Sequence, residues 1–182
     1  MNLLGVGILA AVALTILVIL VRTAGRAYWR SRGERVVQCP ETGAPAGVSV
    51  DAKAAALATL RGTRELELSS CTRWPERAGC GQDCVREIEK APEGCLVRQI
   101  VAAWFEGKSC VLCGKDLSHI DWTTHKPGLM HPERRILAWH EVAAVEVRAV
   151  LETHQPMCWD CQIIETLVQR YPERVTFRPR HS

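Results

Sequence analysis

The N-terminal segment of the chain is apolar without interruption. No charged side chain occurs from Met1 to Val21, and a helix of this length, at about 1.5 Å per residue, can cross roughly 30 Å of hydrocarbon. A cleaved signal peptide has a basic stretch before its apolar core and a small-residue cleavage site after it, and the sequence shows neither. The pattern therefore predicts a transmembrane anchor over residues 1–22.

The first half of the remaining chain alternates short apolar runs with turn residues. Valine-rich runs on either side of a Pro/Gly turn predict two short strands, within residues 36–43 and 48–50. Residues 51–60 begin with a capping aspartate and are followed by a glycine stop, which predicts a helix. Strict alternation over residues 64–69 predicts a half-buried strand that leads into Cys71.

The second half of the chain predicts further helices and strands. Apolar residues at helical spacing, bounded by Pro or Gly, predict helices over residues 83–91, 93–105 and 159–171. Short apolar runs predict strands over residues 120–123, 136–140 and 175–177, whereas the segment 141–151 fits either type. In the last helix the residues expected to face the core are Ile163, Ile164, Leu167 and Val168.

Together these elements predict an α+β fold in which a transmembrane helix precedes a small cysteine-rich domain. We expect an anchor over residues 1–22, a basic juxtamembrane connector over 23–36, an N-terminal cysteine-containing subdomain over 37–107 and a second such subdomain over 108–182. The part outside the membrane is long enough to bury a core of its own. Its fold therefore need not depend entirely on a metal.

Charge is concentrated directly after the apolar segment. The net charge is +3, but the surplus comes from one arginine-rich stretch that contains a single acid, Glu34, and the rest of the chain is close to neutral. A nucleic-acid-binding surface needs basic residues spread over the folded domain, so this class of partner is not expected. Because basic residues favour the cytoplasmic side of a membrane span, we expect the C-terminal bulk in the cytoplasm. Tyr28 and Trp29 fit the interface.

Two Cys-x-x-Cys pairs carry the strongest chemical signal among the nine cysteines. In the reducing cytoplasm, cysteines are metal ligands or redox groups rather than structural disulfides. The first pair, Cys110 and Cys113, is followed by a glycine that permits a tight turn, so both sulfurs can face one ion. The second pair, Cys158 and Cys161, stands at the start of the predicted C-terminal helix, where the helix dipole favours thiolates.

A turn with two cysteines, then strands, then a helix with two more in its first turn resembles the treble-clef class of zinc fingers. The resemblance covers roughly residues 109–171 and implies that Cys110, Cys113, Cys158 and Cys161 bind one zinc within the 108–182 subdomain. The separation between the two pairs is longer than in that class. Residues 151–177 also fit a thioredoxin-like redox unit with Cys158 as the attacking thiol, but too little chain follows to complete that fold.

The remaining cysteines suggest a second metal site. Cys80 and Cys84 can share one helix face, Cys71 ends a predicted strand, and Cys39 lies in a Cys-Pro-x-Thr-Gly turn. These four thiolates could hold zinc or an iron–sulfur cluster, and Cys95 could replace Cys39. Alternatively, all five are small buried apolar side chains.

No catalytic constellation is evident in the sequence. His119, His125 and His154 have no ligand partner at fixed helical spacing and fit polar turn positions. We find no phosphate loop and no nucleophile or metalloprotease motif, so the sequence leans away from an enzyme without deciding the question, and it identifies no small-molecule substrate. The arrangement is also similar to uncharacterised single-span, cysteine-rich bacterial membrane proteins. We expect a membrane-anchored zinc-binding protein that acts structurally with a protein partner, as an accessory to a complex; the alternative is a membrane-bound redox protein.

Overall fold

A computed structural model describes residues 3–63, 65–77, 79–122 and 124–174 of the chain. The chain forms two compact units, Met1–Glu93 and Gly94–Ser182. The predicted subdomain boundary at residues 107/108 lies inside the second unit, because helix α4 (Val97–Phe105) buries Val101 and Phe105 there and packs against helix α5 (Val147–Thr153).

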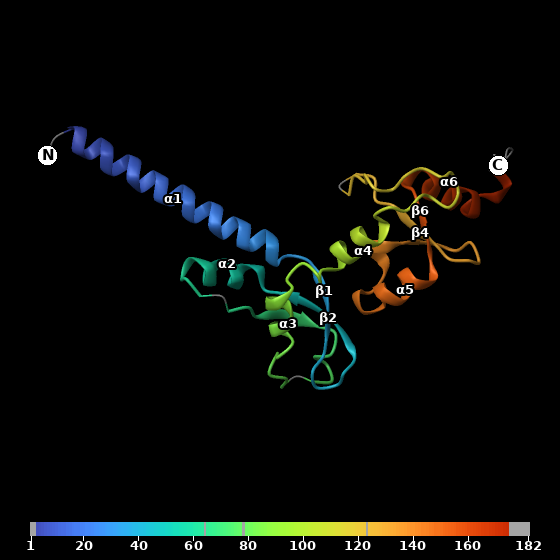
Figure 1. The fold of residues 1–182 in the computed structure, drawn as a ribbon, viewed down its shortest axis with the longest axis horizontal. Helices are drawn as coiled ribbons and strands as arrows, with labels where there is room; N and C mark the ends of the chain where they lie inside the picture. The colour runs from blue at the N-terminus through green and yellow to red at the C-terminus, as the bar shows by residue number, and fades with distance from the viewer. Residues whose placement is uncertain (1–2, 64, 78, 123, 175–182) are drawn as a thin grey trace. The chain divides into compact units, whose positions relative to one another are not determined.

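The first unit begins with one long helix, α1 (Leu3–Ser31) (Figure 1). Its stretch Gly5–Ser31 is long and apolar enough to cross a membrane, with a mean hydropathy of 2.5 over its most apolar part. The helix continues through most of the predicted basic connector instead of ending near Val21, since alanine and arginine are good helix formers. It ends before Gly33, whose φ of 106° suits glycine.

The end of α1 is fixed by a buried arginine. Arg35 is 1% exposed, and its guanidinium donates hydrogen bonds to the backbone carbonyls of Arg30, Ser31 and Gly33 at 2.8–3.0 Å. The last carbonyls of a helix lack partners within the helix and carry partial negative charge. Arg35 therefore serves the fold of the first unit, whereas the sequence suggested only a role in membrane orientation.

A three-stranded antiparallel sheet forms the core of the first unit. Its strands β1 (Glu34–Gln38), β2 (Pro45–Val50) and β3 (Leu68–Cys71) lie in the order β1-β2-β3. Helix α2 (Ala52–Leu60) begins at Asp51, whose carboxylate accepts two backbone N–H bonds as predicted, and α2 packs along α1 (Figure 1). Helix α3 (Val85–Lys90) buries Ile88. The predicted strand over 64–69 lies a few residues further along, as β3, and position 64 is outside the described residues.

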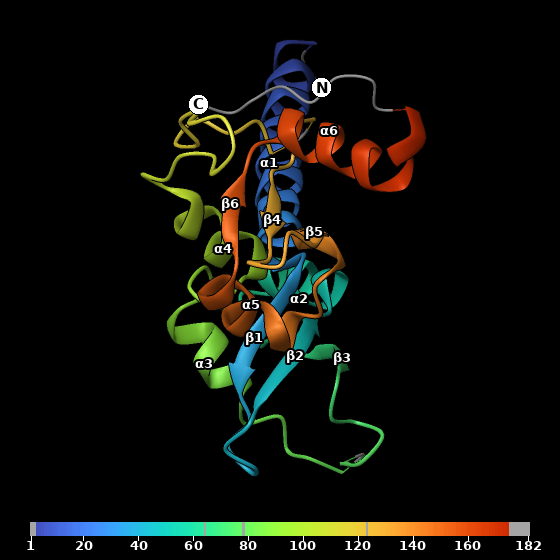
Figure 2. The same cartoon turned by 90° about the vertical axis from the view of Figure 1, so that its right-hand side faces the viewer.

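The second unit has a smaller sheet with helices around it. Strands β4 (Gly128–Met130), β5 (Ile136–Ala138) and β6 (Gln155–Met157) pair in the antiparallel order β5-β4-β6 (Figure 2). Helix α6 (Trp159–Arg170) follows β6 directly. Three short 3₁₀ turns complete the unit among the described residues: Trp139–Glu141, Ala144–Glu146 and Pro172–Arg174.

Three expectations for the second unit need correction or lie outside the described residues. Residues 120–122 form no strand; the strand lies instead at Gly128–Met130, in a segment expected to be a loop. In α6, Ile163, Ile164 and Leu167 are 40%, 49% and 52% exposed rather than facing the core. The predicted strand over 175–177 lies outside the described residues.

Candidate metal centre

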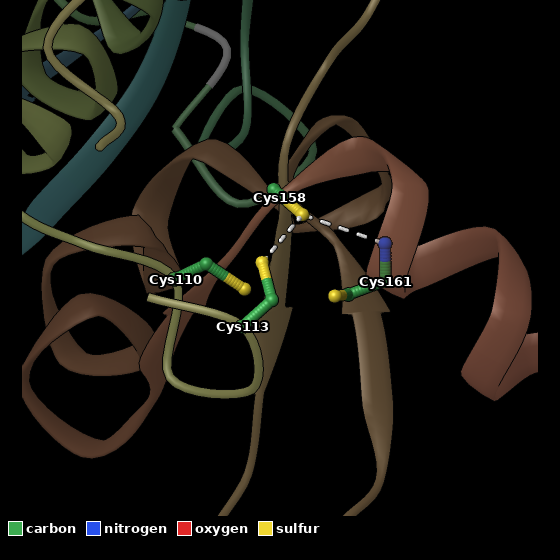
Figure 3. Close-up of side chains that lie close together, drawn as sticks. All are labelled: Cys110, Cys113, Cys158 and Cys161. Carbon is green, nitrogen blue, oxygen red and sulfur yellow. Dashed lines mark hydrogen bonds between the residues drawn. The ribbon is translucent and has the colours of Figure 1, made fainter. Parts of the chain in front are cut away.

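The first cysteine pair lies in a tight backbone turn. The Cys110 N–H donates to the Lys115 carbonyl at 2.8 Å, and the Gly114 N–H donates to the Cys110 carbonyl at 2.9 Å. Gly114 has a φ of 72°, a conformation that a residue with a Cβ rarely adopts. A bridge between Ser109 and Asp116 closes the turn. This geometry turns the sulfurs of Cys110 and Cys113 toward the same side (Figure 3).

Strand β6 brings the second pair to this turn. Cys158 follows β6 as the N-cap of α6, and its sulfur accepts a hydrogen bond from the Cys161 N–H at 3.4 Å. The Val111 N–H donates to the Pro156 carbonyl at 2.9 Å, which attaches the first turn to β6. The pairs are distant in sequence, and this contact places them side by side.

The sulfurs of Cys110, Cys113, Cys158 and Cys161 all lie within 4.8 Å of one another, and Figure 3 shows them pointing toward a common centre. The Cys113 and Cys158 sulfurs are 3.7 Å apart. Four sulfurs at about 2.3 Å from a tetrahedral ion would be roughly 3.8 Å from one another. The cluster therefore has nearly the spacing that a single tetrahedral ion requires.

Burial and hydrogen bonding act in opposite directions on these thiols. Burial alone would raise the pKa of Cys110, but hydrogen bonds from the backbone N–H groups of Cys158, Cys113 and Leu112 outweigh it and lower the pKa to about 7. Burial raises the pKa of Cys158 and of Cys161, and the neighbouring thiols raise that of Cys161 further. A bound dication would remove this cost, because it favours the thiolate of each ligand.

One ion pair beside the cluster was not predicted from the sequence. The Lys115 ammonium and the Asp160 carboxylate are 3.0 Å apart and join the first turn to the first turn of α6. The hydrogen bond to Asp160 raises the pKa of Lys115, and the charges of Cys158 and Cys113 act in the same direction. Lys115 thus places a positive charge near the thiolates. The sequence contained a signal for this contact: Lys115 lies two residues after the first Cys-x-x-Cys pair, and the oppositely charged Asp160 lies within the second.

The other predicted ligands lie apart from this cluster. Cys39, Cys71, Cys80 and Cys84 line one small cavity in the first unit, but within the described ranges only the C-terminal four bring their ligand atoms within 4.8 Å of one another. Cys95, the predicted substitute, is buried in the second unit and is not among the residues lining that cavity.

The histidines do not join the four-cysteine cluster. His119 and His125 line a cavity beside Cys158, and the His125 ring meets the Trp159 ring edge-on at 6.2 Å. His154 packs against the His131 ring with the ring centres 5.1 Å apart. Among the residues that the structure describes, the cluster that could hold a metal contains cysteines only.

Comparison with known proteins assigns no family to the chain. No family model, curated protein or solved structure matches it. The interpretation of the site therefore depends on the geometry and chemistry of its own residues.

Proposed function

We propose that the chain is a membrane-anchored zinc-binding protein with a structural role, acting as an accessory to a membrane complex. The observation that carries this proposal is the four-sulfur cluster of Cys110, Cys113, Cys158 and Cys161. A tetrahedral set of four thiolates is the donor set of structural zinc sites. Catalytic zinc sites usually keep a position open for water, which four cysteine ligands do not leave.

The residues present fit such an ion. Cys110, Cys158 and Cys161 are at most 7% exposed, so their thiolates need a cation to offset the loss of solvation. Backbone N–H groups already donate to the Cys110 and Cys158 sulfurs, and such outer contacts orient ligands and tune their charge. Zinc would supply a cross-link that holds the turn at Cys110 to the start of α6.

The competing function is a redox dithiol at Cys158 and Cys161. A redox-active cysteine needs a reachable thiolate, but Cys158 is 3% and Cys161 is 7% exposed. The exposed member of the cluster is Cys113, which belongs to the other pair. Burial of both α6 cysteines therefore favours the structural role.

The anchoring and orientation are part of the same proposal. The described apolar side chains between Val6 and Val21 are exposed on α1, as a lipid-facing helix requires. Arg22, Arg26, Arg30 and Arg32 follow the apolar stretch, which supports a cytoplasmic C-terminal part by the positive-inside rule.

Metal analysis of the full chain, purified in detergent without added metal or chelator, tests the proposal. We expect a colourless protein that contains zinc and loses the ion of this cluster, one zinc per chain, when Cys110 and Cys113 are both replaced by serine. A protein that carries no zinc and forms a Cys158–Cys161 disulfide in a glutathione redox buffer would support the redox function instead. A brown protein with iron and sulfide would indicate a cluster.

A further inference from the structure

A second set of cysteines lines one small cavity in the first unit, although its sulfurs are not drawn together as those of the C-terminal cluster are. Cys39 follows β1 in the β1–β2 loop, Cys71 ends β3, and Cys80 and Cys84 lie in the segment before α3. All four line the same cavity, although they come from three separate parts of the chain. Cys84 and the three other cysteines therefore border the same small space.

Backbone donors already point at two of these sulfurs. The Arg73 N–H donates to the Cys71 sulfur at 3.4 Å, the same distance as the Cys161 N–H to the Cys158 sulfur in the C-terminal cluster. Hydrogen bonding from the Thr42 side chain and from the Glu41 backbone lowers the pKa of Cys39. Such donors favour the anionic form of a sulfur ligand.

The segment that carries Cys80 and Cys84 is held in an unusual conformation. Gln82, between them, has a φ of 57°, which is uncommon for a residue other than glycine. Its side-chain oxygen accepts a hydrogen bond from the Leu68 N–H at 3.1 Å. This bond fixes the segment against the start of β3, the strand that ends at Cys71. Gln82 thus holds Cys80 and Cys84, on either side of it, at the cavity.

The charges around the cavity suit an anionic metal–thiolate centre. Arg73 and Arg77 line it, and the Arg73 Nε is buried with no hydrogen-bond partner among the described residues. A buried donor without an acceptor is costly, and a metal-bound thiolate would supply one. Both arginines also have an acidic neighbour: Arg73 lies 3.7 Å from Glu76 and Arg77 lies 3.6 Å from Glu41, while Asp83 of the cavity lies 3.5 Å from Arg86. The distinguishing feature is therefore the Arg73 Nε, which is unpartnered within the described ranges.

The size of the cavity indicates which group it can take. Its volume is about 20 Å³, close to the space of one water-sized sphere. That volume accommodates one ion. We therefore propose that Cys39, Cys71, Cys80 and Cys84 bind a second zinc ion, which ties the β1–β2 loop and the end of β3 to the segment before α3. Cys95 is not needed as a ligand.

Zinc stoichiometry of full-chain variants tests this site separately from the C-terminal one. Two zinc ions per wild-type chain are expected, with loss of one in Cys84→Ser, loss of one in Cys161→Ser, and loss of both in the double variant. Cys95→Ser is the matched control, because it alters a buried cysteine outside both sets, and it should keep both ions. One zinc in the wild type that survives Cys84→Ser would overturn the second site without touching the first. One zinc that survives Cys161→Ser but not Cys84→Ser would overturn the C-terminal site alone.

Thiol footprinting of the wild-type chain does not depend on how well a variant folds. With zinc bound, Cys39, Cys71, Cys80 and Cys84 should resist alkylation together, and a strong chelator should expose all four at once. Protection that is unchanged by the chelator, a disulfide within this set, or iron with sulfide in place of zinc would each contradict the proposal.

Discussion

Replacing Cys161 by serine is the sharpest single perturbation of the C-terminal site. Cys161 lies in the first turn of α6, is 7% exposed, and its sulfur belongs to the four-sulfur cluster. Serine has nearly the same shape, so the variant removes a thiolate ligand while leaving little empty space. The Cys161 backbone N–H can still donate to the Cys158 sulfur, because that bond does not involve the replaced side chain.

The size of the effect follows from the number of ligands. Structural zinc contributes about 10–16 kcal/mol in small zinc-finger peptides, so each of four thiolates accounts for about 2.5–4 kcal/mol of it. Losing one ligand should weaken zinc binding by roughly 10²- to 10³-fold. At fixed free zinc the second unit loses up to the same free energy of unfolding, a large share of the total stability of about 5–15 kcal/mol typical of a domain.

Hydrogen exchange read by mass spectrometry can locate the loss. In Cys161→Ser, amides of the turn over residues 109–116 and of the first turns of α6 should lose protection together, because the ion joins these two segments. Cys95→Ser, a buried cysteine of the same unit that is outside the cluster, should retain its zinc even if its own packing costs some stability. If Cys161→Ser keeps both its zinc and the protection of residues 109–116, the shared site is refuted.

Three further predictions concern the first unit and the membrane. A chain lacking residues 1–21 should be soluble and folded, whereas removal through Ser31 should lower the melting temperature of the first unit, because α2 packs along α1. In the soluble chain, Arg35→Met should reduce the free energy of unfolding of that unit, measured in urea, by on the order of 3 kcal/mol. The reason is that the carbonyls of Arg30, Ser31 and Gly33 lose their hydrogen-bond donor. An unchanged unfolding midpoint would contradict this prediction. In right-side-out membrane vesicles, added protease should leave the part after Tyr28 intact, and its digestion would reverse the proposed orientation.

The elements predicted correctly are those whose signals are local. Asp51 caps α2 through two backbone N–H bonds, and α6 begins directly after Cys158 and ends before Tyr171. The treble-clef resemblance remains a prediction, since the comparisons do not test it beyond the cysteine cluster. The two Cys-x-x-Cys pairs indicated one shared metal site, and their four sulfurs do lie together.

The elements that were misplaced depend on partners distant in sequence. Strand β4 is three residues long and forms through pairing with β5 and β6. Its residues, which begin at Gly128, carry no local strand signal. Helical periodicity in α6 showed an apolar side but not whether anything packs on it, and Ile163, Ile164 and Leu167 are exposed. The end of α1 is set by Arg35 from the next strand, a contact that composition does not reveal.

Zinc K-edge X-ray absorption on the full chain, purified in its membrane-anchored form, tests the central claim most directly. If Cys110, Cys113, Cys158 and Cys161 hold zinc as a closed structural site, the spectrum should fit four sulfur neighbours at about 2.3 Å with no lighter atom bound. The second site, with its own four thiolates, adds the same signal. A spectrum that requires oxygen or nitrogen ligands, or a well-folded protein that holds no zinc at all, would contradict the account.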